Sequence, residues 1–149
     1  MAQNKQSIST LNSLIETLKD GEEGFKQAAD GVVDLQLKSL FNEYSRQRGR
    51  FANALQTQAQ SLGESKPERS SSAEGALHRA WINLKSAVTR GNDHAILSEC
   101  ERGEDSAVKE YEKALNDDLS PSLREIVSSQ YSEVKNAHDR IRNLRDTRK

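Results

Sequence analysis

The chain has 149 residues, of which 22 are Lys or Arg and 23 are Asp or Glu, so its formal net charge is −1. This balance gives no global field that would attract nucleic acid or an anionic membrane, and we expect neither as a partner. Two prolines and 5% aromatic residues argue against a β-sandwich, and a single cysteine excludes a disulfide framework. The length fits one domain spanning residues 1–149.

The first predicted helix covers about residues 7–29, where apolar side chains recur at steps of three and four. They are Ile8, Leu11, Ile15, Leu18, Phe25 and Ala29. A tight break is predicted at Asp30-Gly31, followed by a second helix that ends at Gly63. Its apolar face holds Val33, Leu37, Leu40, Tyr44, Phe51, Leu55 and Leu62. The short break predicts that the two helices lie antiparallel.

A polar linker is predicted at residues 64–72, and a third, shorter helix follows it. The spacing of Ser71 and Glu74 matches a capping box, which marks the start of a helix. Its apolar stripe comprises Leu77, Trp81, Leu84 and Val88, and Gly91-Asn92 ends it. His78 lies in no recognisable nucleophile motif, so we expect it to dock this helix onto the rest of the protein together with Trp81.

Two further long helices are predicted, at about residues 93–116 and from Pro121 almost to Lys149. The short turn between them makes this pair antiparallel as well. The long middle connection returns the chain to the end where the first turn lies. The predicted fold is therefore all-α: a ferritin-like antiparallel four-helix bundle with a helical crossover between the second and third long helices. No apolar run approaches membrane length, and we expect a cytoplasmic protein.

Three segments carry a family resemblance: DGEEGF at residues 20–25, GALHRAW at 75–81 and ECERGED at 99–105. Together they resemble the bacterial ferritin-like four-helix-bundle family named domain of unknown function 2383. The resemblance covers nearly the whole chain. It implies the ferritin-like fold and a bacterial, cytoplasmic setting, and it carries no established activity.

Acidic residues occupy positions in the helices that a bundle normally fills with apolar side chains. Glu22 continues the apolar line of the first helix, and Glu101 and Glu104 continue that of the helix at 93–116. Counting about 1.5 Å per residue from the two turns puts them at one level, opposite Leu40 to Glu43 of the second helix. The predicted layer comprises Glu22, Glu43, Glu101, Glu104, Glu133 and His138.

One interpretation of this layer is a metal site for iron or manganese, which accept carboxylate and imidazole ligands. Ferritin-like di-iron proteins use one Glu from each of two helices and Glu-x-x-His from each of the other two. Here the third residue after Glu43 is Arg46, and the third after Glu133 is Asn136, so the pattern is incomplete. The other interpretation is a hydrogen-bonded layer that fixes helix register. In it, the acids pair with Arg46, Arg48, Arg102, Gln47 or Gln130.

Two functions of different classes follow from these interpretations. The first is a non-enzymatic cytoplasmic protein with a structural, interaction or stress-associated role, acting as a dimer through an exposed helix face. The second is a metal-binding bundle with the carboxylate layer as its site. A third, weaker hypothesis is a small apolar ligand in space opened by Gly21, Gly24 and Gly103.

Overall fold

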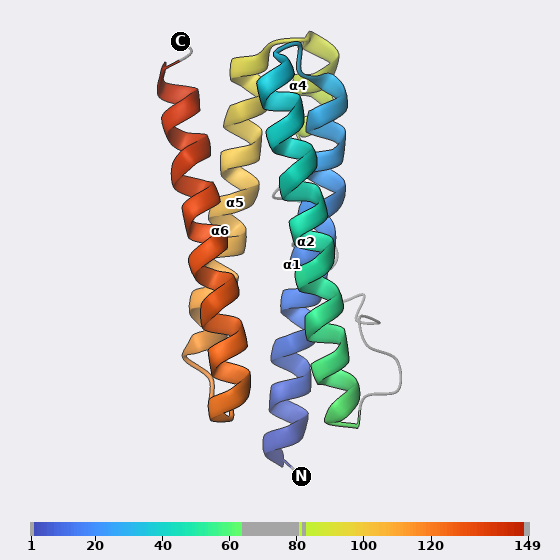
Figure 1. The fold of residues 1–149 in the computed structure, drawn as a ribbon, viewed down its shortest axis with the longest axis vertical. Helices are drawn as coiled ribbons and strands as arrows, with labels where there is room; N and C mark the ends of the chain where they lie inside the picture. The colour runs from blue at the N-terminus through green and yellow to red at the C-terminus, as the bar shows by residue number, and fades with distance from the viewer. Residues whose placement is uncertain (1, 64–80, 82, 148–149) are drawn as a thin grey trace.

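The computed structural model describes residues 2–63, 81 and 83–147, and all regular structure in this part is helical (Figure 1). The helices are α1 (Ala2–Gly31), α2 (Leu35–Ser61), α4 (Leu84–Arg90), α5 (Asp93–Leu115) and α6 (Pro121–Thr147). The all-α prediction is confirmed. The predicted linker at 64–72, the capping box and His78 lie outside the described residues.

The four long helices run side by side in an up-down-down-up order. Figure 1 shows α1 rising from the N-terminus, α2 returning beside it, α5 descending from the end where α4 lies, and α6 rising to the C-terminus. One contact fixes the relation of the two hairpins. The Asp93 carboxylate at the start of α5 accepts hydrogen bonds from the backbone N–H groups of Val33 (2.9 Å) and Asp34 (3.1 Å) in the α1–α2 turn. The third long helix thus begins beside the first turn, as predicted.

The helix ends follow from local side-chain chemistry. Asp34 accepts from the N–H groups of Gln36 and Leu37 and caps α2, and Asn92 caps α5 through the N–H of Ala95 at 3.1 Å. Gly91 ends α4 with a φ of 65°, a backbone conformation that glycine adopts without strain. The Ser120 hydroxyl accepts from the N–H of Leu123 at 3.3 Å, ahead of Pro121.

The first break lies a few residues later than predicted. The first helix continues through Gly31, and the turn occupies 32–34 because Asp34 supplies the cap that starts α2. Val33, predicted to lie on the apolar face of the second helix, is instead in this turn and 75% exposed. The first helix also begins at Ala2 rather than near residue 7.

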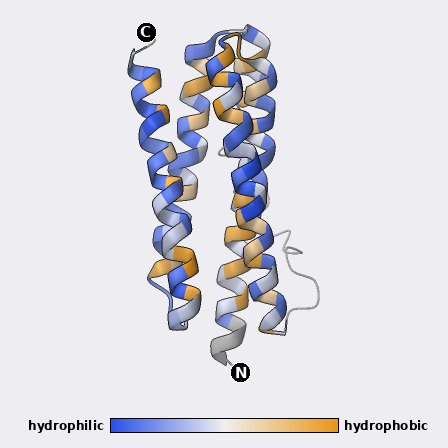
Figure 2. Cartoon of the chain, in the orientation of Figure 1, coloured by the Kyte–Doolittle hydropathy of each residue, from blue (hydrophilic) through white to orange (hydrophobic). Residues whose placement is uncertain are grey.

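The core consists of two apolar clusters, one near each end of the bundle. The cluster nearest α4 includes Phe25, Phe41, Trp81, Leu97 and Ile141, and the other includes Leu11, Leu18, Leu55, Tyr111 and Val127. Figure 2 shows hydrophobic positions interspersed with hydrophilic ones along each long helix, the pattern of helices that bury one side. Between the clusters, the apolar sequence of α2 is interrupted at Arg48 and that of α5 at Glu104.

Within the described part of the chain, no helix combines the length and the apolar character needed to cross a bilayer.

Candidate functional site

An ion pair between α2 and α5 lies at the centre of the bundle. Glu104 is fully buried and Arg48 is 1% exposed. Arg48 Nη2 donates to Glu104 Oε2 at 2.8 Å, and Nη1 donates to Oε1, so the contact is bidentate. Two opposite charges in this geometry offset the cost of removing each from water, which explains how both remain in the core.

Aromatic rings of α1 and α2 surround the guanidinium of Arg48. Its Cζ atom lies 5.3 Å from the ring centre of Phe25 and 5.9 Å from that of Tyr44, within cation–π distance. Burial alone would lower the pKa of Arg48, but the charge and hydrogen bonds of Glu104 hold it above the ordinary value. The arginine therefore stays cationic in the folded protein.

A second buried polar contact connects α5, α6 and α2. The Tyr111 hydroxyl donates to Gln130 Oε1 at 2.7 Å, and Gln130 Nε2 donates to the backbone oxygen of Phe51 at 3.3 Å. Burial raises the pKa of Tyr111, so the phenol stays protonated as the donor. An acid was the predicted partner of Gln130, but the partner is a tyrosine on the neighbouring helix.

Glu22 lies at the α1–α2 contact. Its carboxylate rests against Gly49, where a Cβ atom would lie 2.6 Å from Glu22 Oε2. The Ser45 hydroxyl donates to the backbone oxygen of Glu22 at 2.8 Å. The level of Glu22 on α2 is thus near residues 45–49, and the prediction that it faces Leu40 to Glu43 is wrong. The late turn between α1 and α2 accounts for much of the shift.

Glu101 and His138 meet on the α5–α6 side of the bundle. Glu101 is paired with Arg145, and its Oε2 lies 4.0 Å from His138 Nε2. The same nitrogen lies 2.5 Å from Asp105 Oδ1, and His138 Nδ1 lies 3.0 Å from Asp139 Oδ1. The hydrogen bond with His138 lowers the pKa of Asp139. Sequence reasoning missed these partners because Asp105, Asp139 and Arg145 resemble ordinary solvent-facing charges.

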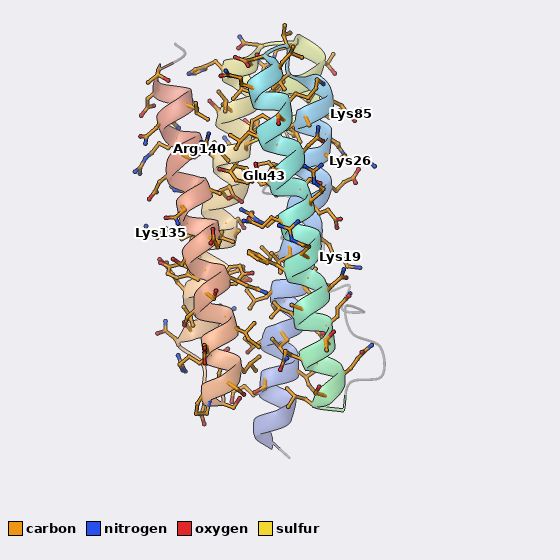
Figure 3. All side chains as sticks on the ribbon, in the orientation of Figure 1. Lys19, Lys26, Glu43, Lys85, Lys135 and Arg140 are labelled. Atoms are coloured by element: carbon orange, nitrogen blue, oxygen red, sulfur yellow. The ribbon has the colours of Figure 1, made fainter. Side chains whose placement is uncertain are left out.

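The structure thus separates the six residues of the predicted layer. It brings Glu101 and His138 together, joins Glu104 to Arg48, and places Glu22 against α2. Glu43 is exposed on α2 (Figure 3), and Glu133 is exposed on α6. Among the residues that the structure describes, no three His, Cys, Asp or Glu side chains are grouped so that they could hold a metal ion. The iron or manganese site stays a prediction.

The glycines near the polar layer contact side chains. A Cβ atom on Gly24 would lie 2.5 Å from the indole of Trp81, and one on Gly103 would also overlap that ring. A Cβ atom on Gly21 would lie 3.6 Å from Arg48 Cγ. The space proposed for a small apolar ligand is therefore filled by Trp81 and Arg48. Trp81 packs between α1 and α5, which agrees with the prediction that this residue docks onto the long helices.

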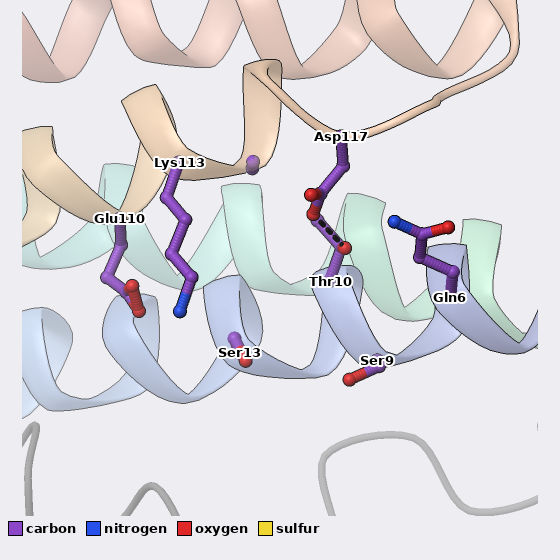
Figure 4. Close-up of a pocket in the computed structure, with 8 residues that line it drawn as sticks. Gln6, Ser9, Thr10, Ser13, Glu110, Lys113 and Asp117 are labelled. Atoms are coloured by element: carbon purple, nitrogen blue, oxygen red, sulfur yellow. Dashed lines mark hydrogen bonds between the residues drawn. The ribbon is translucent and has the colours of Figure 1, made fainter.

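A shallow groove between the start of α1 and the end of α5 was not predicted. It has a volume of about 250 Å³, and Thr10 and Asp117 meet across it through a hydrogen bond of 2.5 Å (Figure 4). Its lining comprises Gln6, Ser9, Thr10, Ser13, Glu110, Lys113, Ala114 and Asp117. The sequence gives no signal for it, because hydroxyl and charged residues are common on exposed helix surfaces.

A family model with the description "Domain of unknown function (DUF2383)" matches residues 6–117, which include all three segments that carry the resemblance. No curated protein matches the chain.

Proposed function

The chain belongs to the family described as Domain of unknown function (DUF2383), and we propose that it is a non-enzymatic helical interaction protein. We assign it a ferritin-like four-helix bundle, which the up-down-down-up order of α1, α2, α5 and α6 supports. Its setting is the bacterial cytoplasm, as the family resemblance implies. A stress-associated role stays a prediction.

The observation that carries this proposal is the bidentate contact between Arg48 and Glu104. A carboxylate that binds a metal or acts as a base needs an oxygen directed at its ligand. Both oxygens of Glu104 instead accept hydrogen bonds from Arg48. The guanidinium also repels any metal cation at the same place. The most deeply buried acid of the described chain is therefore committed to joining two helices.

Metal binding remains the alternative, favoured by one contact. Glu101 and His138, both candidate ligands, approach to 4.0 Å across the α5–α6 interface. Iron or manganese at this place would have to displace Arg145 from Glu101 and the Asp105 carboxylate from its contact with His138.

Elemental analysis separates the two functions. The full chain is purified without chelator and compared with a Glu101→Ala, His138→Ala double variant and, as a control, with a Glu23→Ala, Lys26→Ala double variant, whose two positions are exposed on α1. Our proposal expects no stoichiometric iron or manganese in any sample. Stoichiometric metal in the wild type that is lost from the double variant would overturn it and establish the alternative.

A further inference from the structure

The side of the bundle formed by α2 and α6 has few contacts between its two helices. Packing is extensive between α1 and α2, between α5 and α6, and between α1 and α5, whereas α2 and α6 are close to each other at only a few residues. A hydrogen bond from Gln130 of α6 to the backbone oxygen of Phe51 joins the two helices. Figure 1 shows both helices on the face turned to the viewer, with no other described helix in front of them.

Each of the two helices carries one acidic and one basic side chain on this side of the bundle. We define the α2–α6 face by six residues: Glu43, Gln47 and Arg50 on α2, and Glu133, Asn136 and Arg140 on α6. Gln47 is half-buried and the other five are exposed. The four charged residues form no ion pair with any other residue that the structure describes.

The four charges lie at two levels along the bundle, and at each level an acidic residue of one helix is at the height of a basic residue of the other. The Gln130–Phe51 contact sets the level of α6 against α2, and counting about two turns from it along both helices puts Glu43 and Arg140 at about the same height. Figure 3 labels Glu43 on α2 and Arg140 on α6 at similar heights. Close to the Gln130–Phe51 contact itself, Glu133 and Arg50 lie at similar heights on the two helices.

We propose that the α2–α6 face binds the same face of a second copy of this chain. The inference rests on the proposed interaction role and names its partner. A two-fold dimer requires a self-complementary surface. An axis parallel to the helices brings Glu43 onto Arg140 of the partner subunit. An axis perpendicular to them brings Glu43 onto Arg50 of the partner subunit. Either arrangement joins opposite charges and covers the sparsely packed side of the bundle.

Sedimentation equilibrium of the full chain tests the pairing. The wild type is expected to dimerise, and the single reversal Arg140→Glu is expected to weaken the dimer at least about tenfold, because it places like charges together under both axes. The matched control reverses Glu23 and Lys26 on the outer face of α1, where both are exposed. That control should dimerise as the wild type does, and circular dichroism confirms that each variant is folded.

Rescue variants identify the axis. Glu43→Arg with Arg140→Glu restores the opposite charges for the parallel axis, and Glu133→Arg with Arg140→Glu restores them for the perpendicular axis. Recovery in either double variant supports the face. A wild type that is monomeric at every concentration, or a dimer insensitive to Arg140→Glu, would overturn it.

Disulfide trapping gives a second measurement, which does not depend on whether the charge-reversal variants fold. A chain carrying Glu43→Cys is mixed with one carrying either Arg140→Cys or Arg50→Cys and oxidised. A mixed disulfide dimer is expected with one of the two partners, and none with a control chain carrying Lys26→Cys. The absence of both mixed dimers would contradict the pairing. Failure here leaves the elemental analysis unaffected, so the two proposals fail separately.

Discussion

At the scale of single residues, one residue from each of the three segments that mark the family lies at Trp81 or against it. Gly24 comes from the first segment and Gly103 from the third, and the indole of the second lies between them. The next residue along α5 after Gly103 is Glu104, which is bound to Arg48. These residues of the three segments therefore hold helices together. Their contacts account for a structural role and indicate no particular reaction.

Glycine substitutions at two neighbouring positions should have opposite effects on stability. Gly24→Ala forces a methyl group onto the Trp81 ring and should lower the free energy of unfolding by about 1–3 kcal/mol. Gly21→Ala meets Arg48 at an ordinary contact distance and should raise it by up to about 1 kcal/mol, through better helix propensity. Urea unfolding measures both. Equal effects at the two positions would show that Trp81 does not occupy this space.

Cys100 should make the folded protein sensitive to alkaline pH. Burial raises the pKa of its thiol well above the ordinary 9.0. As the pH rises, the thiol loses its proton in the unfolded chain before it does so in the folded protein. The contribution of Cys100 to the free energy of unfolding is therefore complete below pH 9.0 and declines above it. The melting temperature should fall between neutral pH and about pH 10, and by less in Cys100→Ala. Parallel curves for wild type and variant would contradict this assignment.

At the scale of elements, the α1–α2 turn depends on a residue distant in sequence. Asp93 of α5 accepts from the N–H groups of Val33 and Asp34, so the turn between the first two helices is fastened by the third long one. Asp93→Ala should cost about 1–3 kcal/mol and increase hydrogen exchange at these two amides. The control, Asp30→Ala, removes an exposed acid just before the turn and should change neither. Unchanged exchange in Asp93→Ala would contradict the contact.

Helices were predictable from sequence because their apolar periodicity is strong, whereas the site was not. A difference of a few residues in the first turn moved the α2 level of Glu22 from Leu40–Glu43 to Gly49. Arg48 was among several possible partners for the acids, although its spacing from Tyr44 and Leu55 places it, unlike the exposed Arg46, on the apolar side of α2. Spacing along one helix cannot reveal which side chain of another helix it meets.

At the scale of the whole molecule, two apolar clusters alone do not determine how α2 is aligned with α5. Leucines and alanines recur along both helices, and both pack on α1, so a slide of either by one turn along α1 would keep apolar side chains in contact. Arg48 and Glu104 oppose this slide in addition to the Asp93 contact with the α1–α2 turn, because each would then be buried without its partner. A buried charge pair thus specifies one alignment even where it adds little stability.

Replacing both charges should separate stability from specificity. Arg48→Ala alone should cost about 3–5 kcal/mol, because Glu104 stays buried without its cation. Arg48→Leu with Glu104→Leu should be much less costly and keep full helicity by circular dichroism, but its amide NMR resonances should broaden and it should bind a hydrophobic dye. A double variant with sharp, wild-type-like resonances would show that the alignment of α2 and α5 is set elsewhere, for example by Trp81.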